Sequence, residues 1–371
     1  MVSVPFLLGV EAAGTGAHPA SWRRPDSRAE ELFTGGYWAD AVAALEAAGV
    51  DLLFLPDSFA LQQGGPGVTR GRLDAVAVAA RVAAGTHRIG LLPQAAVTHT
   101  EPFHLSKSIQ ALDYASLGRA GWEVTVSPGA EQAAAFGRKP EQDDPALWHE
   151  ADEAIDVSVR LWDSWEDDAE IRDIRTGRFI DREKLHYIDF AGDNFSVKGP
   201  SITPRSPQGQ PVVAVRAGAA GDPATAVAVR RADLIRVAAA EPEALAAQRD
   251  RLRAAVAAAG RDAEQVFVLA ELDIHLAATV ERAEAEVAEL NGWFPTQTSA
   301  AHIGTTDTLR ATLVALAGAV DGIVLRPLAL AAALPALGRL GHTPPDSGST
   351  LRDRLGLERP ASRYALGGAP L

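Results

Sequence analysis

The sequence predicts a (β/α)₈ barrel, a closed ring of eight parallel strands surrounded by helices. Eight short apolar runs rich in Val, Ile and Leu recur along the chain, and stretches of helical period separate them. Strands that alternate with helices build parallel sheets, and eight such units in 371 residues favour a closed barrel over an open sheet. No strand is followed by G-x-G-x-x-G, so a dinucleotide-binding fold has no support.

The order of these elements predicts the domain organisation. The predicted strands are 4–11, 50–57, 87–95, 121–127, 210–217, 232–239, 265–276 and 321–328. The clearest helical stretches are 37–49, 73–85, 103–118 and 241–260, and several end in Gly, the usual residue after a helix. A polar segment at about 165–210 is predicted to be an insertion between strands four and five, in which FSVKGP forms a short strand. Residues 1–339 are therefore expected to form one barrel domain, and 340–371 a tail packed on it with a short helix in TLRDRLGLERP.

Composition and charge exclude several classes of protein. The formal net charge of −13 argues against binding to nucleic acid or to an anionic membrane surface. The absence of cysteine excludes disulfides, a thiolate nucleophile and a cysteine-ligated metal, and it fits a reducing cytoplasm. The apolar start MVSVPFLLGVEAAG has no basic segment, so we interpret it as the first strand and not as a signal peptide. No run of 18 apolar residues predicts a transmembrane helix.

Charged side chains are predicted to point into the barrel. In GWEVTVS (121–127) a large apolar face that begins at Trp122 alternates with a polar face that begins at Glu123. Because the outer face of a barrel strand packs on helices, the polar face must point inward. The same alternation directs further polar residues inward or towards the C-terminal mouth: Arg216, Glu271, Asp273 and His275. The sequence therefore indicates a polar pocket at the C-terminal face, the alternative being strand-end residues solvated at the rim.

Glu123 and Arg216 are predicted to form an ion pair inside the barrel. Strands four and five should be neighbours, and the planar guanidinium of Arg suits two-pronged binding of a carboxylate. We therefore expect the two side chains to be in direct contact.

The stretch RIGLLPQAAVTHTEPFHLSKSIQALDYASLGRAGWEVTVS (88–127) resembles the bacterial luciferase-like monooxygenases. The resemblance is greatest to the nitrilotriacetate, dibenzothiophene-sulfone and pristinamycin-type subgroup, and it covers nearly the whole chain in order. Further matching motifs are HPASWRRPDS, LFLPDS, LWDSWEDDA, FSVKGPSITPRSPQGQPVV and TLRDRLGLERP. The resemblance implies a barrel that is usually oligomeric. It also implies oxygenation of a small organic substrate with O₂ and reduced FMN, which a separate reductase supplies.

The resemblance also implies a set of site residues. Asp57 and His104 correspond to catalytic positions, with Asp57 beside the flavin. The implied cofactor-binding residues are Thr98, Glu123, Ser127, Arg216 and Gly218. Several positions depart from the family pattern. Glu123 replaces an Asn, residues 216–220 read RAGAA in place of QAG-x-S, and Leu147 and Trp148 replace an Arg-Tyr pair that helps to hold the phosphate.

These departures leave alternative functions open. Leu147 and Ala220 offer no side-chain donor to a phosphate dianion, and Glu123 adds a negative charge. The chain could therefore be a family member without flavin, acting as a non-catalytic partner subunit or a binding protein. It could also be an enzyme with another cofactor, such as a deazaflavin, or with none. The expected partners are a small-molecule substrate, a flavin reductase or paralogous subunit, and further copies of the chain. The spacing of His99 and His104 does not support a metal site, and none is expected.

Overall fold

The structure, a computed structural model, describes residues 6–364 apart from 66, 297–300 and 345–347. Eight parallel strands lie in the order β10-β9-β4-β3-β2-β1-β13-β11, and pairing of β10 with β11 closes the ring. The strands are β1 (Leu7–Glu11), β2 (Leu52–Leu55), β3 (Gly90–Ala96), β4 (Gly121–Thr125), β9 (Val212–Arg216), β10 (Leu234–Ala238), β11 (Phe267–Leu276) and β13 (Gly322–Pro327). The predicted (β/α)₈ barrel is confirmed, and each predicted run contains or overlaps its strand. Residues 4 and 5 of the first predicted run lie outside the described residues.

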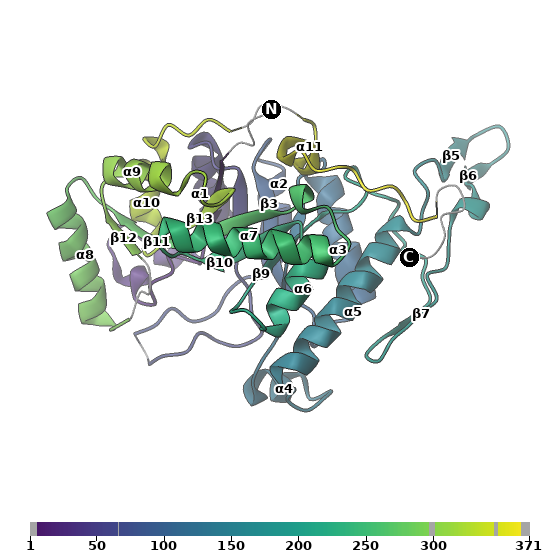
Figure 1. Cartoon of the computed structure of the whole chain (residues 1–371), viewed down its shortest axis with the longest axis horizontal. Coiled ribbons are helices and arrows are strands. Elements are labelled where there is room, and N and C mark those ends of the chain that lie inside the picture. The colour runs from purple at the N-terminus through teal and green to yellow at the C-terminus, as the bar shows by residue number, and fades with distance from the viewer. Residues whose placement is uncertain (1–5, 66, 297–300, 345–347, 365–371) are drawn as a thin grey trace.

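Helices surround the ring (Figure 1). They are α1 (Gly35–Ala47), α2 (Ala75–Ala83), α3 (Pro102–Ala115), α4 (Ala130–Phe136), α5 (Asp144–Asp163), α6 (Pro223–Arg231), α7 (Pro242–Ala258), α8 (Val280–Trp293), α9 (Thr306–Leu316), α10 (Leu330–Gly338) and α11 (Leu351–Leu355). Side-chain caps fix several of their first turns, as where Thr34 accepts a hydrogen bond from the Tyr37 N–H at the start of α1. None of the helices in the described part of the chain is long and apolar enough to cross a membrane.

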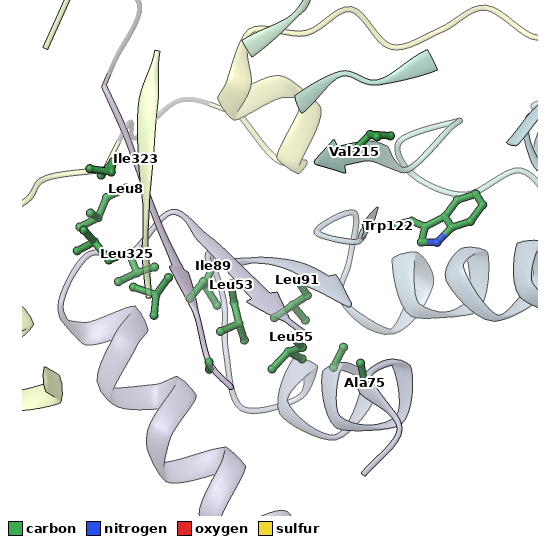
Figure 2. Close-up of a cluster of buried hydrophobic side chains, with 14 of the residues drawn as sticks. Leu8, Leu53, Leu55, Ala75, Ile89, Leu91, Trp122, Val215, Ile323 and Leu325 are labelled. Atoms are coloured by element: carbon green, nitrogen blue, oxygen red, sulfur yellow. The ribbon is translucent and has the colours of Figure 1, made fainter. Parts of the chain in front are cut away.

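An apolar layer joins the ring to the helices. Outward-facing strand residues such as Leu53, Leu91 and Trp122 pack with helix residues such as Ala75, and all of them are buried (Figure 2). Trp122 is fully buried and meets Trp162 of α5 edge-on, with ring centroids 6.4 Å apart. This contact confirms that the apolar face of β4 packs on helices, as the alternation in GWEVTVS predicts.

A second apolar layer fills the lower half of the ring, by which we mean the half nearest the N-terminal ends of the strands. It contains inward residues such as Leu52, Leu92 and Leu269, together with Leu351 and Leu355 of α11. α11 covers the N-terminal ends of the strands, where Leu351 packs so tightly on Gly90 that an added Cβ there would lie 2.9 Å from its side chain. The predicted short helix in the tail is therefore confirmed and closes the N-terminal end of the barrel.

The segment between β4 and β9 forms α4, α5 and two small hairpins outside the ring (Figure 1). The hairpins pair β5 (Glu170–Asp173) with β6 (Arg178–Ile180), and β7 (Phe190–Ala191) with β8 (Ser196–Val197). β8 confirms the short strand predicted in FSVKGP. An element that the sequence did not reveal is β12 (Ala301–Gly304), which pairs with the far end of β11 beyond the ring.

The packing of α11 predicts a specific stability effect. Replacing Leu351, which is 2% exposed, with Ala removes buried methyl groups and leaves a cavity, so the free energy of unfolding should fall by about 2–5 kcal/mol. Urea denaturation followed by circular dichroism measures the loss. A matched control is Val314→Ala on α9, where the side chain is 70% exposed and the expected change is within about 0.5 kcal/mol. Equal effects of the two substitutions would show that α11 does not contribute to the barrel core.

Candidate active site

A cluster of charged side chains occupies the upper half of the ring, above the apolar layer. It contains three arginines and four carboxylates from six of the eight strands: Glu11 (β1), Glu123 (β4), Arg216 (β9), Arg236 (β10), Glu271 and Asp273 (β11), and Arg326 (β13). We call these seven residues the axial cluster. An ordinary barrel has layers of aliphatic side chains at this level, so the cluster confirms that polar groups are directed inward.

Arg236 lies at the centre of the axial cluster, and its side chain is completely buried. One terminal nitrogen, Nη1, lies 2.6 Å from Oε1 of Glu123, and the other, Nη2, lies 2.5 Å from Oε2 of Glu11. Its Nε lies 3.0 Å from Oε1 of Glu271. Below it, the guanidinium stacks over the ring of Phe54 at 4.4 Å, a cation–π contact. A single arginine thus links three strands, with an aromatic ring beneath it.

The direct contact between Glu123 and Arg216 that the sequence predicts is absent, and that prediction is wrong. Arg216 instead contacts Glu271 at 2.6 Å and Glu11 at 3.1 Å. The strand register gives the reason. Glu123 pairs with Ala214, so Arg216 lies two residues nearer the mouth, and its side chain is 45% exposed. Arg236 of β10, which is the register partner of Arg216, has a completely buried side chain that reaches Glu123 instead.

Three members of the axial cluster were missed at the level of the sequence. These are Glu11, Arg236 and Arg326, which lie in LLGVE, LIRVA and GIVLRP. Each strand carries the same alternation that identified Glu123, with large apolar residues on the helix-facing side. Applying the alternation to all eight strands would have found them, whereas their pairing depends on the register of distant segments.

The cluster shifts the pKa values of its carboxyl groups in opposite directions. Burial by itself raises the pKa of Glu11, but Arg236, Arg216 and Arg326 outweigh burial and lower it to about 2. For Glu123 burial is the larger effect and its pKa is raised, because Arg236 and Arg216 only partly offset it. The Oε2 atom of Glu123 has no hydrogen-bond partner among the described residues. Glu11 is therefore stabilised as a carboxylate, whereas ionised Glu123 is costly.

The predicted cofactor residues on β3 and β4 meet at the C-terminal ends of those strands. Oγ1 of Thr98 accepts a hydrogen bond from the Ser127 N–H at 2.9 Å, and both residues are buried. The Ser127 hydroxyl has no partner among the described residues, and neither ring nitrogen of His99 has one. His99 is buried and stacks on Phe136 of α4 with ring centroids 4.7 Å apart. The sequence suggested His99 only as a possible metal ligand. Because its ring is buried and both ring nitrogens lack partners among the described residues, it is instead a candidate to hydrogen-bond a ligand.

Asp57 and His104 lie in different surroundings. Both carboxylate oxygens of Asp57 accept backbone hydrogen bonds, from Ser58 at 2.7 Å and from Ala75 at 2.9 Å. Burial raises the pKa of Asp57, and these hydrogen bonds only partly offset that effect. His104 is exposed on the first turn of α3, and the structure does not group it with Asp57. In the described part of the chain, the one group with metal-ligand geometry is His149, Glu153 and Asp193, and it includes neither Asp57 nor His104.

Arg216 and Gly218 border the connection between β9 and α6. Gly218 is packed so closely against Asp222 that an added Cβ would clash with the carboxylate. Asp222 caps α6 by accepting a hydrogen bond from the Ala224 N–H at 2.8 Å. The carboxylate of Asp222 therefore already interacts with the positive, N-terminal end of the α6 dipole.

A pocket of about 250 Å³ opens beside the ends of β1 and β2. The β1–α1 connection (12–34) and the β2–α2 connection (56–74) enclose it, and we call it the loop pocket. Most of its lining is apolar, with Leu55, Trp38 and Val78 among the buried residues. Apolar pockets with a few polar groups at the C-terminal mouth of a barrel are where small molecules bind.

Arg236 is predicted to be essential for stability. Replacing it with Met leaves three buried carboxylates without their shared cation, and breaking a buried pair in this way costs about 3–5 kcal/mol. The free energy of unfolding of the Arg236→Met variant in urea at pH 7 should fall by that amount. A loss below about 1 kcal/mol, typical of an exposed pair, would contradict the central role of Arg236.

Glu123→Gln is predicted to be tolerated, because the amide keeps the shape and removes a costly charge. The sign of the pH dependence follows from the raised pKa of Glu123. In the wild type, the stabilisation from this group is present below the unfolded value, about 4.5, and is lost as the pH rises through the folded value. The stability of the variant relative to wild type should therefore increase between pH 4.5 and pH 8. Parallel denaturation series at these two pH values test this, and a relative stability that falls with pH would reject the assignment.

The chain is similar in sequence and in fold to several known proteins. The family model described as luciferase-like monooxygenase matches residues 14–319. N-acetyl-S-(2-succino)cysteine monooxygenase of Bacillus subtilis (strain 168) is 35% identical over 283 residues, which are 76% of this chain and 64% of that protein. The match therefore spans less than two thirds of that relative's length.

Two further matches cover more of the length of the related protein. One of the two subunits of pristinamycin IIA synthase of Streptomyces pristinaespiralis is 32% identical over 326 residues, 88% of this chain and 90% of that protein. The crystal structure of a riboflavin lyase with modified FMN and riboflavin superposes with a TM-score of 0.84 at 26% identity, covering 98% of both chains. By its sequence, its closed parallel barrel and these similarities, the chain belongs to the luciferase-like monooxygenase family.

Proposed function

We propose that this chain is a flavin-dependent monooxygenase that oxygenates a small organic substrate with O₂. Reduced FMN, delivered by a separate reductase, is the proposed source of electrons. Membership of the luciferase-like monooxygenase family supports the reaction class. The position of unpartnered polar groups at the C-terminal mouth, where barrel enzymes place their sites, supports the location.

The observation that carries the proposal is a set of buried polar atoms, on β4 and just after β3 and β4, that have no hydrogen-bond partner among the described residues. They are the hydroxyl of Ser127, both ring nitrogens of His99 and Oε2 of Glu123. Buried polar atoms nearly always have a partner, so several unpaired ones on and just after two neighbouring strands indicate a missing ligand or water. Hydroxyl, imidazole and carboxyl groups can together accept and donate hydrogen bonds, as the edge of an isoalloxazine ring requires. The residues at this end of the site therefore fit a flavin ring.

The residues at the phosphate end fit less well. Leu147 is buried and apolar, Ala220 has no side-chain donor, and Asp222 directs a carboxylate at the α6 N-terminus. Arg216 is the nearest cation in the sequence, but Glu11 and Glu271 already bind it. A phosphate dianion would therefore find backbone N–H groups and a competing negative charge. We infer that the flavin is held mainly through its ring and that the phosphate contributes little affinity.

The chain itself would position the flavin and shield the site. When bound, a reduced flavin would supply the redox chemistry that O₂ requires, which side chains cannot perform. Thr98 fixes the backbone at Ser127, and Asp57 fixes the turn between β2 and α2 through its two hydrogen bonds. Phe136 covers His99, and Phe59 meets Phe136 edge-on, so these aromatic rings would exclude water from one side of the site.

The proposal also includes partners. The chain matches nearly the full length of one pristinamycin IIA synthase subunit, and the other subunit of the same enzyme is 30% identical over 292 residues. We propose that this chain works with a flavin reductase, and that association with a second, related protein or a further copy of itself completes the assembly.

The weak phosphate site predicts that riboflavin binds almost as well as FMN. Under anaerobic reducing conditions, calorimetric titration should give dissociation constants for the two flavins that differ by less than about threefold, under 1 kcal/mol. A well-formed phosphate site would instead favour FMN by the several charge-assisted hydrogen bonds that it makes.

The matched variant is Asp222→Asn, which keeps the α6 cap and removes the negative charge. It should strengthen FMN binding and leave riboflavin binding unchanged. A strong preference of the wild type for FMN would contradict the weak phosphate site. Absence of binding by either flavin at high micromolar concentration would reject the flavin-dependent function itself.

A further inference from the structure

The loop pocket is a built cavity and not a gap between mobile loops. Two hydrogen bonds tie the connections on its two sides together: the Trp22 indole donates to the carbonyl of Gly67 at 2.9 Å, and the Thr69 N–H donates to the carbonyl of Pro19 at 3.1 Å. The Gln63 amide donates to Glu131 of α4 at 3.1 Å, which anchors the outer connection to the body. These bonds fix the two connections relative to each other and to α4, which lowers the entropy cost of ordering them when a ligand binds.

The volume and lining of the pocket limit the size of a ligand. The pocket has a volume of about 250 Å³. An engineered apolar cavity of about 150 Å³ in another protein binds benzene, so this pocket has room for one ring and a small polar group. The apolar lining residues are Ala12, Ala13, Leu32, Trp38, Leu55 and Val78. A compact hydrocarbon body of about one ring fits this interior.

The polar groups of the lining point to the charge of the ligand. His18 and Gln62 are already occupied, because His18 bonds to Asn291 and to the Ala20 N–H, and Gln62 bonds to Gly71 through both of its amide atoms. Arg72 is different. It is half-buried, it lines the pocket, and no ion pair or hydrogen bond of its guanidinium occurs among the described residues.

No carboxylate in the described part of the chain lines the pocket to balance Arg72. Asp57, the nearest acid along β2, is close enough to feel the charge of Arg72 but lies beyond ion-pair distance and is held by backbone N–H groups. A half-buried arginine without a partner, beside apolar walls, attracts an anion and especially a planar carboxylate or a sulfonate.

We propose that the loop pocket is the substrate site and that it takes a small apolar acid, a carboxylate or sulfonate with a body of about one ring, paired with Arg72. That the bound acid is a substrate rests on the proposed monooxygenase function, whereas the binding of the acid does not. Leu55 and Pro56 line the pocket and lead directly into Asp57, so the bound acid would lie beside the mouth where the flavin is proposed to bind.

Benzoate and benzamide are the probes, since they have the same shape and differ in charge. Calorimetric titration of the full chain at pH 7 without flavin should show benzoate binding at least about tenfold more tightly than benzamide. Arg72→Met should weaken benzoate binding about tenfold and leave benzamide binding unchanged. Arg70→Met is the matched control, because Arg70 lies two residues away, outside the lining, and donates to the carbonyl of Gly64. It should leave the binding of both probes unchanged.

Ala13→Leu tests the location, because the larger side chain fills the pocket and should abolish binding of both probes. Far-ultraviolet circular dichroism of each variant confirms that it folds. Equal affinity for the two probes, no binding of either at about 5 mM, or unchanged benzoate binding in Arg72→Met or Ala13→Leu would each overturn the proposal. Since no flavin is present, these outcomes are independent of the flavin titration, whose failure would remove the proposed reaction and leave the acid-binding site.

Discussion

The arrangement of the barrel mouth depends on one buried guanidinium. Arg236 contacts Glu11, Glu123 and Glu271, so a single side chain connects β10 with β1, β4 and β11 across the ring. Such contacts are directional, and each partner left alone would be a buried charge that must be neutralised or hydrated. The cluster therefore specifies the relative heights of the strands more sharply than aliphatic packing does. Phe54 below and the partly exposed Arg216 above complete a column of interacting side chains along the axis.

This column divides the barrel into two halves with different physical character. The lower half is an apolar core covered by α11, and it contributes hydrophobic stabilisation that is independent of pH. The upper half is held by ion pairs, and within this one network the ionised forms of two carboxyl groups are affected in opposite ways. Glu11 is stabilised as an anion, whereas burial penalises the ionised form of Glu123. Stability and the electrostatic potential at the mouth are therefore coupled.

Because charged side chains fill the axis of the barrel, the proposed ligand sites lie nearer its rim. Ser127 and His99, whose side chains have no hydrogen-bond partner in the part of the chain that the structure describes, follow β4 and β3. The loop pocket lies beside β1 and β2. The two regions are adjacent around the ring, since β2 pairs with β3. A cofactor at the first and a substrate at the second would meet near Asp57, whose hydrogen bonds hold the turn between them. The axial cluster would then act as a floor of fixed charges under both.

The sequence by itself determined the strands, their inward faces and the family. Alternation of apolar and polar residues has a period that depends only on local geometry, so Glu123 could be directed inward and Trp122 outward from one short segment. Only the tertiary structure decided which charges meet. Arg236 and not Arg216 is the partner of Glu123, because register places Arg216 two residues nearer the mouth than Glu123. Glu123 and Arg236 are 113 residues apart in the sequence, so no local pattern determines that they meet. The loop pocket likewise exists only because two connections, each without regular structure, are tied together in space.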